Sequence, residues 1–213
     1  MLIIFDCDGV LVDSELLANH VLADYLTELG FPHTREECTQ NFVGKSMPSI
    51  VCIIEEETSQ KLPGDFCEEL LRRDKSAFKG RLQAIPGVAD VVVSRTGPKC
   101  VASSSSFERI YNSLRNTKLL SYFEPYIFSA SQVASGKPAP DLFLFASKKM
   151  DVLAAECLVI EDSVAGVIAG KTAGMRVVGF TGGSHCGPEH EEKLFDAGAD
   201  QVFDNMMDLG NSL

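Results

Sequence analysis

The sequence predicts an α/β protein in which a doubly wound parallel sheet carries an inserted all-helical domain. The chain opens on a short apolar run at residues 2–5, typical of a strand that is buried on both faces. Residues 15–83 show helical spacing and loops without a convincing strand. From residue 84 onward, short apolar runs alternate with helical segments. Such alternation builds a parallel sheet through right-handed crossovers.

The inserted segment begins with an amphipathic helix that ends near Gly30 and whose apolar residues recur at helical spacing: Leu17, Val21, Tyr25 and Leu29. Asp13 and Ser14 are candidates for its N-cap, and we interpret Asp13 as a cap or hinge residue. Further helical segments are expected around 50–57 and 65–78, with a loop at 43–46.

The second part of the chain supplies the rest of the sheet. We expect helices over 88–94, 110–120, 140–150 and 165–173, and strands at 100–103, 126–130, 157–160, 177–180 and 201–203. We therefore divide the chain into a Rossmann-like core domain, residues 1–14 and 84–213, and a helical cap domain, residues 15–83. Because the cap leaves the core just after the first strand, we expect it to act as a lid over that edge of the sheet.

Composition narrows the classes of function. The formal net charge of -11 argues against nucleic-acid and anionic-membrane partners, which require basic surface. No apolar run approaches the ~18 residues of a membrane span, and no signal peptide is expected because the first residues enter a strand directly. The 7 cysteines are scattered without a Cys-x-x-Cys pair, which predicts free thiols in a reducing cytoplasm. We expect a monomer or a weak dimer.

Polar side chains follow the ends of several predicted strands or lie in the loops beyond them: Asp6, Asp8, Ser103, Lys137, Glu161 and Asp162. The carboxyl ends of parallel strands lie on one edge of a doubly wound sheet, where ligands bind. Carboxylates there suit a hard divalent cation, or a nucleophile beside an acid/base. Together with a hydroxyl and a lysine, they suit phosphoryl transfer, which depends on positioning and on neutralising oxygen charge.

Four segments in this order resemble the motifs of the haloacid dehalogenase-like hydrolase superfamily: Asp6-Cys-Asp8-Gly-Val-Leu-Val-Asp13-Ser, Val101-Ala-Ser103, Gly136-Lys137-Pro-Ala-Pro-Asp141 and Val159-Ile-Glu161-Asp162-Ser163. The position of the helical insert resembles that of the β-phosphoglucomutase-like sugar-phosphate phosphatases. The four motifs span almost the whole chain, so the resemblance is specific.

The resemblance implies a role for each matching residue. Asp6 would be the nucleophile that forms an aspartyl phosphate, and Asp8 would protonate the leaving alcohol and then activate water. Ser103 would bind phosphoryl oxygens, and Lys137 would pair with Asp6 and the phosphoryl group. The implied cofactor is Mg²⁺, held by Asp6, the backbone carbonyl of Asp8, and Asp162, with Glu161 as a direct or water-mediated ligand.

The presence of Asp8 favours phosphoester cleavage over dehalogenation. Family dehalogenases release halide, which needs no proton, and they lack an aspartate at this position. Family mutases carry a histidine in the first cap helix and an arginine in the cap loop. The matching positions here are Ala18 and Met47, which favours hydrolysis, although His20 lies nearby. The cap's basic residues are expected either to meet an anionic substrate or to form a solvated face: Lys45, Arg72, Arg73 and Lys75.

Two further sets of residues could be either structural or functional. Cys7 lies between the two aspartates, and we interpret it as a core residue. His185 and His190 flank Cys186 and suggest a metal, but without a partner set we interpret the segment as an ordinary loop.

We therefore expect a Mg²⁺-dependent phosphatase of a small phosphorylated metabolite, either a sugar phosphate or a phosphorylated sugar acid. Two alternatives stay open. One is a phosphomutase of the β-phosphoglucomutase type, and the other is a non-catalytic sensor that binds phosphate esters.

Overall fold

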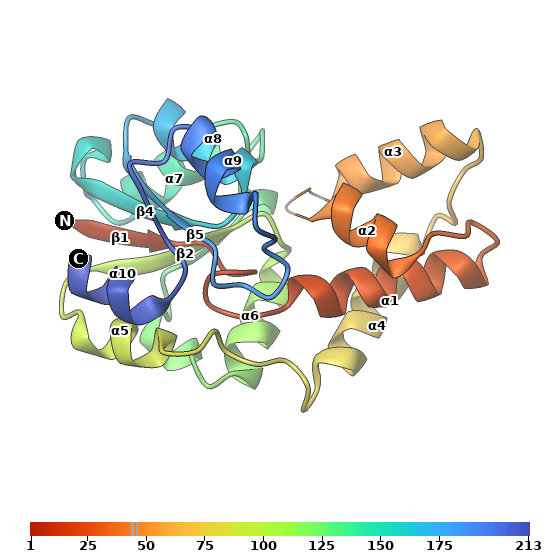
Figure 1. Ribbon diagram of the computed structural model, residues 1–213, viewed down its shortest axis with the longest axis horizontal. Helices are drawn as coiled ribbons and strands as arrows, with labels where there is room; N and C mark the ends of the chain where they lie inside the picture. The colour runs from red at the N-terminus through yellow and green to blue at the C-terminus, as the bar shows by residue number, and fades with distance from the viewer. Residues whose placement is uncertain (44, 46) are drawn as a thin grey trace.

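The computed structural model describes residues 1–43, 45 and 47–213, and within them a parallel sheet has the strand order β3-β2-β1-β4-β5-β6 (Figure 1). The strands are β1 Leu2–Phe5, β2 Lys99–Ser103, β3 Ile127–Ser129, β4 Cys157–Glu161, β5 Arg176–Phe180 and β6 Gln201–Phe203. The predicted doubly wound α/β fold is confirmed. β1 lies between β2 and β4, so the strand order reverses beside β1, and such switch points form ligand crevices.

Alternate side chains of each strand pack into two hydrophobic clusters, one on each face of the sheet. Ile3 and Phe5 belong to the first cluster, and Leu2 and Ile4 to the second. The first face is covered by α5 Val88–Ser94, α6 Phe107–Asn116 and α10 Met206–Ser212, and the second by α7 Asp141–Lys149, α8 Val164–Thr172 and α9 His190–Asp196. Cys7 is buried in the first cluster, as predicted.

The inserted segment contains α1 Glu15–Glu28, α2 Arg35–Phe42, α3 Met47–Thr58 and α4 Phe66–Phe78, which lie to one side of the sheet in Figure 1. They enclose a third hydrophobic cluster that draws all its buried members from residues 22–70. We call residues 15–83 the cap and the remainder the core. Among the described residues, none of the helices has the length and apolar character needed to cross a membrane.

The two connections between cap and core run side by side. The Asp13 amide donates to the Gln83 carbonyl oxygen at 3.0 Å, and the Ile85 amide donates to the Leu11 carbonyl oxygen at 3.0 Å. Val12 and Ala84 form an antiparallel bridge between them. The chain therefore enters and leaves the cap through two short connecting segments, residues 11–13 and 83–85, which are hydrogen-bonded to each other. They lie beside the predicted boundaries at 14/15 and 83/84.

Several elements differ from the expectation for local reasons. The helix α6 starts at Phe107 because the Ser106 hydroxyl accepts a hydrogen bond from the Arg109 amide and caps it. Three helices, α2, α9 and α10, were not predicted. In α2 only Cys38 and Phe42 are buried, so apolar periodicity is weak, and a capping box starts the helix instead. Of the predicted loop at 43–46, Gly44 and Ser46 lie outside the described residues.

The separate cluster predicts that the cap can be destabilised by itself. Leu26 is fully buried in α1, and Leu26→Ala is expected to cost about 2–5 kcal/mol. Hydrogen exchange measured by mass spectrometry should then accelerate in α1–α4 while the sheet strands stay protected. The matched control is Leu144→Ala, which removes a side chain that is 42% exposed. Equal acceleration in cap and sheet would show that the two parts unfold as one unit.

Candidate active site

The structure brings all the sequence-predicted site residues to one cavity of about 680 Å³ between the carboxyl edge of the sheet and the cap. Asp6 directly follows β1, and its amide donates to the Ile160 carbonyl oxygen of β4 at 2.9 Å. The cavity is lined by Asp6, Asp8, Ser103, Lys137, Glu161 and Asp162. Four of these are carboxylates with at most 8% exposure, so the site concentrates negative charge away from solvent.

Lys137 joins the ends of three strands. Its ammonium donates to Asp6 Oδ1 and Glu161 Oε1, each at 2.5 Å, and to the Ala102 carbonyl oxygen at 3.1 Å. Its side chain is only 3% exposed. Burial lowers the pKa of Lys137, but the charges of Asp6 and Glu161 outweigh burial and raise this pKa above its usual range. Lys137 is therefore a permanent cation inside the site.

Lys137 does not cancel the effect of burial on the pKa of Asp6. Burial raises the pKa of Asp6 well above its usual value, and Lys137 opposes the shift, while Glu161, Asp162 and Asp8 add to it. Among the described residues, the hydrogen bonds and ion pairs of the Asp6 side chain use only Oδ1, so Oδ2 is available to a further cation.

Both oxygens of Glu161 are already engaged. Oε1 accepts from Lys137, and Oε2 accepts from the Ser163 amide at 2.8 Å and the Ser163 hydroxyl at 2.9 Å. The Ser163 hydroxyl in turn accepts from the Gly166 amide at the start of α8. This arrangement suits Glu161 as the residue that orients Lys137, rather than as a direct metal ligand.

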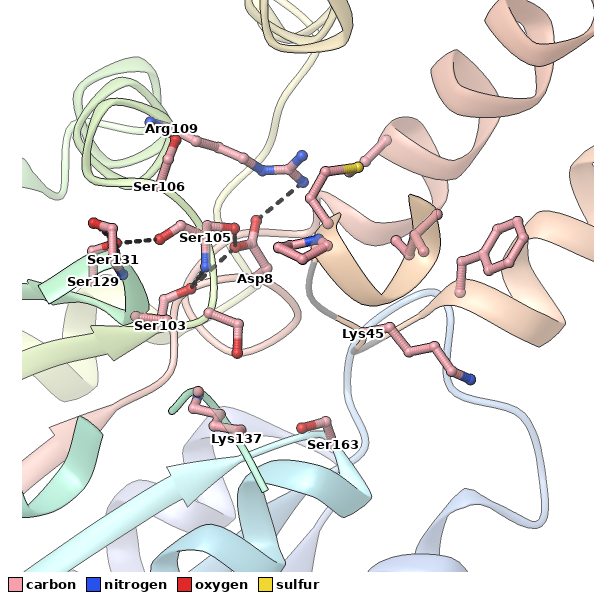
Figure 2. Close-up of a pocket in the computed structure, with 18 of the residues that line it drawn as sticks. Asp8, Lys45, Ser103, Ser105, Ser106, Arg109, Ser129, Ser131, Lys137 and Ser163 are labelled. Carbon is pink, nitrogen blue, oxygen red and sulfur yellow. Dashed lines mark hydrogen bonds and ion pairs between the residues drawn. The ribbon is translucent and has the colours of Figure 1, made fainter. Parts of the chain in front are cut away.

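Asp8 is held as a carboxylate by donors from three elements. It accepts from Ser14 at 2.5 Å. It also accepts from Ser105 at 2.7 Å, and Arg109 Nη2 lies 3.5 Å from its Oδ1 (Figure 2). Burial raises the pKa of Asp8, but Arg109 and the hydroxyl donors outweigh burial and lower this pKa overall. Ser103 lies farther away, with its hydroxyl 3.4 Å from Asp8 Oδ2.

Sequence reasoning missed several of these residues. Ser105 follows the predicted Ser103 by two positions, so the run of serines at 103–106 could have indicated a second site hydroxyl. Ser14 occupies the N-cap position of α1, but its hydroxyl donates to Asp8 instead of accepting from the helix amides. Arg109 carried no local signal, because its role depends on the packing of α6 against the cap.

Arg109 also joins the core to the cap. Its Nη1 lies 2.5 Å from Asp74 Oδ2 in α4, and both side chains are largely buried. Arg109 Nε and Asp74 Oδ1 are buried without a hydrogen-bond partner among the described residues. The guanidinium thus contacts a cap carboxylate and a core carboxylate at the same point of the cavity wall, so the position of the cap affects the surroundings of Asp8.

Glu15 is a second site residue that the sequence did not reveal. It is the first residue of α1, is partly buried, and lines the cavity. Burial and the neighbouring charges of Asp8 and Asp162 raise the pKa of Glu15 to about 7. The cap entrance therefore adds a group that titrates near neutral pH.

Asp162 contacts the loop that follows β5. Its Oδ2 lies 2.9 Å from His185 Nε2, and its carbonyl oxygen lies 2.5 Å from His190 Nε2. Burial lowers the pKa of His185, but its hydrogen bonds to Asp162 and Cys186 outweigh burial and raise this pKa to about 11. The same loop is anchored at Asp13 Oδ1, which accepts from the Ser184 amide and hydroxyl at 3.1 and 2.8 Å.

The two walls of the cavity differ in chemistry. The core wall carries hydroxyls: Ser103, Ser104, Ser105, Ser106, Ser129, Ser131 and Ser163. The cap wall is mainly apolar and includes Ala18 and Met47. Lys45 also lines the cap wall, and its ammonium donates a hydrogen bond to the Asn41 carbonyl oxygen at 2.7 Å.

Of the two alternatives for the other three basic cap residues, the contacts favour an ion-paired face over contact with the substrate. Arg72 and Arg73 pair with Glu69 in their own helix, and Arg73 also pairs with Glu28. Lys75 pairs with Glu108 across the cap–core boundary. None of the three belongs to the described lining of the cavity.

The donor set fits a hard divalent cation. Asp6 and Asp162 offer carboxylate oxygens, which Mg²⁺ and Ca²⁺ prefer over nitrogen or sulfur. Burial is the largest cause of the raised pKa of Asp6, and repulsion from Glu161, Asp162 and Asp8 raises this pKa further. A bound cation at this point would relieve that repulsion.

Comparison with known proteins agrees with this chemistry. A sequence model described as haloacid dehalogenase-like hydrolase matches residues 3–180. A 6-phosphogluconate phosphatase of Escherichia coli (strain K12) is 32% identical over 187 residues, which are 87% of this chain and 85% of that protein.

Two solved structures share the fold over nearly the whole chain. A conserved haloacid dehalogenase-like protein of unknown function from Agrobacterium tumefaciens has 39% identity and a TM-score of 0.84, covering 99% of this chain and 96% of that one. A hydrolase of the same family from Deinococcus radiodurans R1, solved with bound phosphate and sodium, has 31% identity and a TM-score of 0.77, covering 98% and 92%.

The raised pKa of Glu15 predicts a pH-dependent stability. The folded pKa of about 7 exceeds the ordinary value of 4.5, so the protonated folded form is favoured and stability falls as pH rises through 7. Glu15→Gln should therefore stabilise the metal-free protein by about 1–2 kcal/mol more at pH 8 than at pH 5, after allowing for partial exposure. Urea unfolding in EDTA at both pH values measures this. Glu192→Gln, on the exposed side of α9, is the control, and an equal effect of Glu15→Gln at both pH values would contradict the prediction.

Proposed function

The chain belongs to the haloacid dehalogenase-like hydrolase family, and we propose that this phosphatase uses Asp6 as a nucleophile to hydrolyse a sugar phosphate or a phosphorylated sugar acid with Mg²⁺. The observation that carries the proposal is the Lys137 ammonium, 2.5 Å from both Asp6 and Glu161 at the carboxyl edge of the sheet. A lysine in this position supplies the charge that a carboxylate needs before it can approach a phosphate anion.

In the first half-reaction, an Asp6 carboxylate oxygen attacks phosphorus and forms an aspartyl phosphate. The ester P–O bond breaks, and its electron pair leaves with the alcohol oxygen. Asp8 gives that oxygen a proton. Lys137 and Ser103 stabilise the charge on the phosphoryl oxygens, and losing one such donor costs about 2.7–4 kcal/mol in comparable sites.

In the second half-reaction, Asp8 takes a proton from water, and the water oxygen attacks phosphorus. The bond between Asp6 and phosphorus breaks, which returns Asp6 as a carboxylate and releases inorganic phosphate. The contacts of Asp8 with Ser14, Ser105 and Arg109 favour its charged form, which suits this base step. The acid step requires a protonated Asp8, so we infer that substrate binding weakens the 3.5 Å contact with Arg109.

Mg²⁺ would be held by Asp6, the Asp8 backbone carbonyl and Asp162, with Glu161 orienting Lys137. When bound, a divalent cation neutralises phosphoryl oxygen charge and offsets the repulsion between substrate and carboxylates. The oxygen-rich donor set and the raised pKa of Asp6 support its presence.

The walls of the cavity support a sugar-derived substrate. With the phosphate against Lys137 and Ser103, the remainder of the substrate faces the serines of the core wall, which can bind sugar hydroxyls. Lys45 lies in the cap, and in Figure 2 its side chain extends away from Asp8 and Lys137, so its ammonium would have to turn inward to meet a carboxylate at the far end of a sugar acid. The resemblance to a 6-phosphogluconate phosphatase favours the same substrate class.

The cap lining favours hydrolysis over phosphomutase chemistry. Ala18 and Met47, at the positions where family mutases carry histidine and arginine, both line the cavity. Neither side chain transfers a proton or binds an anion.

A panel of phosphorylated metabolites that includes 6-phosphogluconate and hexose phosphates, assayed with Mg²⁺, tests the proposal. We expect release of inorganic phosphate, loss of activity in EDTA, and at least about a 1,000-fold loss of kcat in Asp6→Asn. The fold of this variant should stay intact because Lys137 keeps Glu161. Asp90→Asn, on the exposed side of α5, is the matched control.

Other outcomes identify the alternatives. An active Asp6→Asn would rule out the nucleophile. Conversion of a hexose 1-phosphate to its 6-phosphate without free phosphate would indicate a mutase. Tight binding of phosphate esters without turnover, including p-nitrophenyl phosphate, would indicate a sensor.

A further inference from the structure

The loop between β5 and α9 gathers metal-ligating side chains beside the proposed phosphatase site. His185, Cys186 and His190 each offer one ligand atom, and these atoms all lie within 4.8 Å of one another. The interpretation of this segment as an ordinary loop rested on the absence of a partner set. The folded chain supplies that set, because the two histidines also contact Asp162.

Three potential ligand atoms of the cluster lie close together, and a bound Zn²⁺ would replace the proton that His185 Nε2 donates to Asp162, releasing it to solvent. His185 Nε2 lies 3.3 Å from Cys186 Sγ and 2.9 Å from Asp162 Oδ2. Ligand atoms bound to one Zn²⁺ at about 2.0–2.3 Å are separated by similar distances in a tetrahedron. A thiolate, imidazoles and one carboxylate are all ligand types that Zn²⁺ accepts, and a thiolate with imidazoles selects against Mg²⁺.

The second histidine is oriented by an outer contact. His190 Nε2 lies 2.5 Å from the Asp162 carbonyl oxygen, so this nitrogen is the donor and Nδ1 keeps its lone pair. A backbone carbonyl that fixes the tautomer of a histidine in this way is typical of metal sites. Asp162 therefore contributes its carboxylate to one histidine and its carbonyl to the other.

The loop is also held in shape before any ligand arrives. Ser184 is bonded twice to Asp13 Oδ1, and the Cys186 amide donates to the Gly183 carbonyl oxygen at 3.0 Å. Cys186 and His190 are partly exposed, which gives an ion from solvent a way in. A preformed, accessible cluster binds metal without the cost of ordering a loop.

We infer that His185, Cys186 and His190 form a binding site for Zn²⁺, with the Asp162 carboxylate as the fourth ligand. This site differs from the proposed Mg²⁺ site in its ligand chemistry and shares only Asp162 with it. A bound Zn²⁺ withdraws Asp162 from the phosphatase site. Given the proposed function, on which this step rests, zinc is therefore an inhibitor of the phosphatase, and the inhibition requires Cys186.

Direct metal binding tests the site without reference to phosphatase activity. The wild-type chain, stripped of metal and kept reduced with a phosphine, is titrated with Co²⁺ as a spectroscopic substitute and then with Zn²⁺ against a chromophoric chelator. We expect one Co²⁺ per chain with a thiolate-to-cobalt charge-transfer band, and displacement of this Co²⁺ by Zn²⁺. Absence of the band, or of stoichiometric Zn²⁺ binding, would overturn the proposal.

Matched cysteine variants assign the site. Cys186→Ser should lose the band and weaken Zn²⁺ binding by at least about 100-fold, since even outer-shell changes cost 10–100-fold. Cys52→Ser, which alters an exposed thiol on α3, should bind as the wild type does. Equal binding by both variants would place the zinc elsewhere. Thermal unfolding shows that each variant is folded, and His190→Asn replaces Cys186→Ser if the latter is not.

The role of Asp162, the ligand shared with the proposed Mg²⁺ site, is tested by Zn²⁺ affinity and by inhibition of the phosphatase. Asp162→Asn should weaken Zn²⁺ binding at least about 10-fold, and unchanged affinity would remove Asp162 from the ligand set. In the phosphatase assay, Zn²⁺ should inhibit the wild type at concentrations that leave Cys186→Ser active, and equal inhibition would contradict the regulatory role. If no phosphatase substrate is found, the titrations still decide the zinc site.

Discussion

The bridge from Lys137 to Asp6 and Glu161 is the interaction on which the rest of the site depends. It places one cation, buried to 97% of its side-chain surface, where the ends of β1, β2 and β4 meet. Without it, Asp6 and Glu161 would be buried without a positively charged partner, and breaking a buried ion pair typically costs about 3–5 kcal/mol. The doubly wound order with β1 between β2 and β4 makes this meeting possible, because it places three neighbouring strand ends beside the loop that carries Lys137.

Charge balance connects the fold to the proposed chemistry. Lys137 and Arg109 each neutralise one region of the cavity, and each does so by contacting two carboxylates. The Arg109 contacts differ from those of Lys137 because one of them reaches the cap. The cap is therefore linked to the core by the hydrogen-bonded connecting segments at residues 11–13 and 83–85. It is also linked by the buried ion pair between Arg109 and Asp74. The position of the cap and the surroundings of Asp8 are in this way physically coupled.

Much of this organisation could be predicted from the sequence, for identifiable reasons. Buried parallel strands such as Cys157–Glu161 begin as continuous apolar runs. Their ends, and the polar residues found there, can therefore be recognised in the sequence. The helix α2 was missed because only two of its side chains face a core. Arg109 and Glu15 were missed because their surroundings come from distant segments. The contacts of His185 and His190 with Asp162 could not be predicted from the sequence, because more than twenty positions separate them in the chain.

The central claim is that Asp6 becomes covalently phosphorylated during turnover. Rapid acid quench of the enzyme with Mg²⁺ and a substrate, followed by borohydride reduction and peptide mapping, tests it directly, because reduction converts an aspartyl phosphate to homoserine. The account predicts homoserine at position 6, dependent on substrate and absent in EDTA. Turnover without any modified residue, or with homoserine at another aspartate, would contradict it.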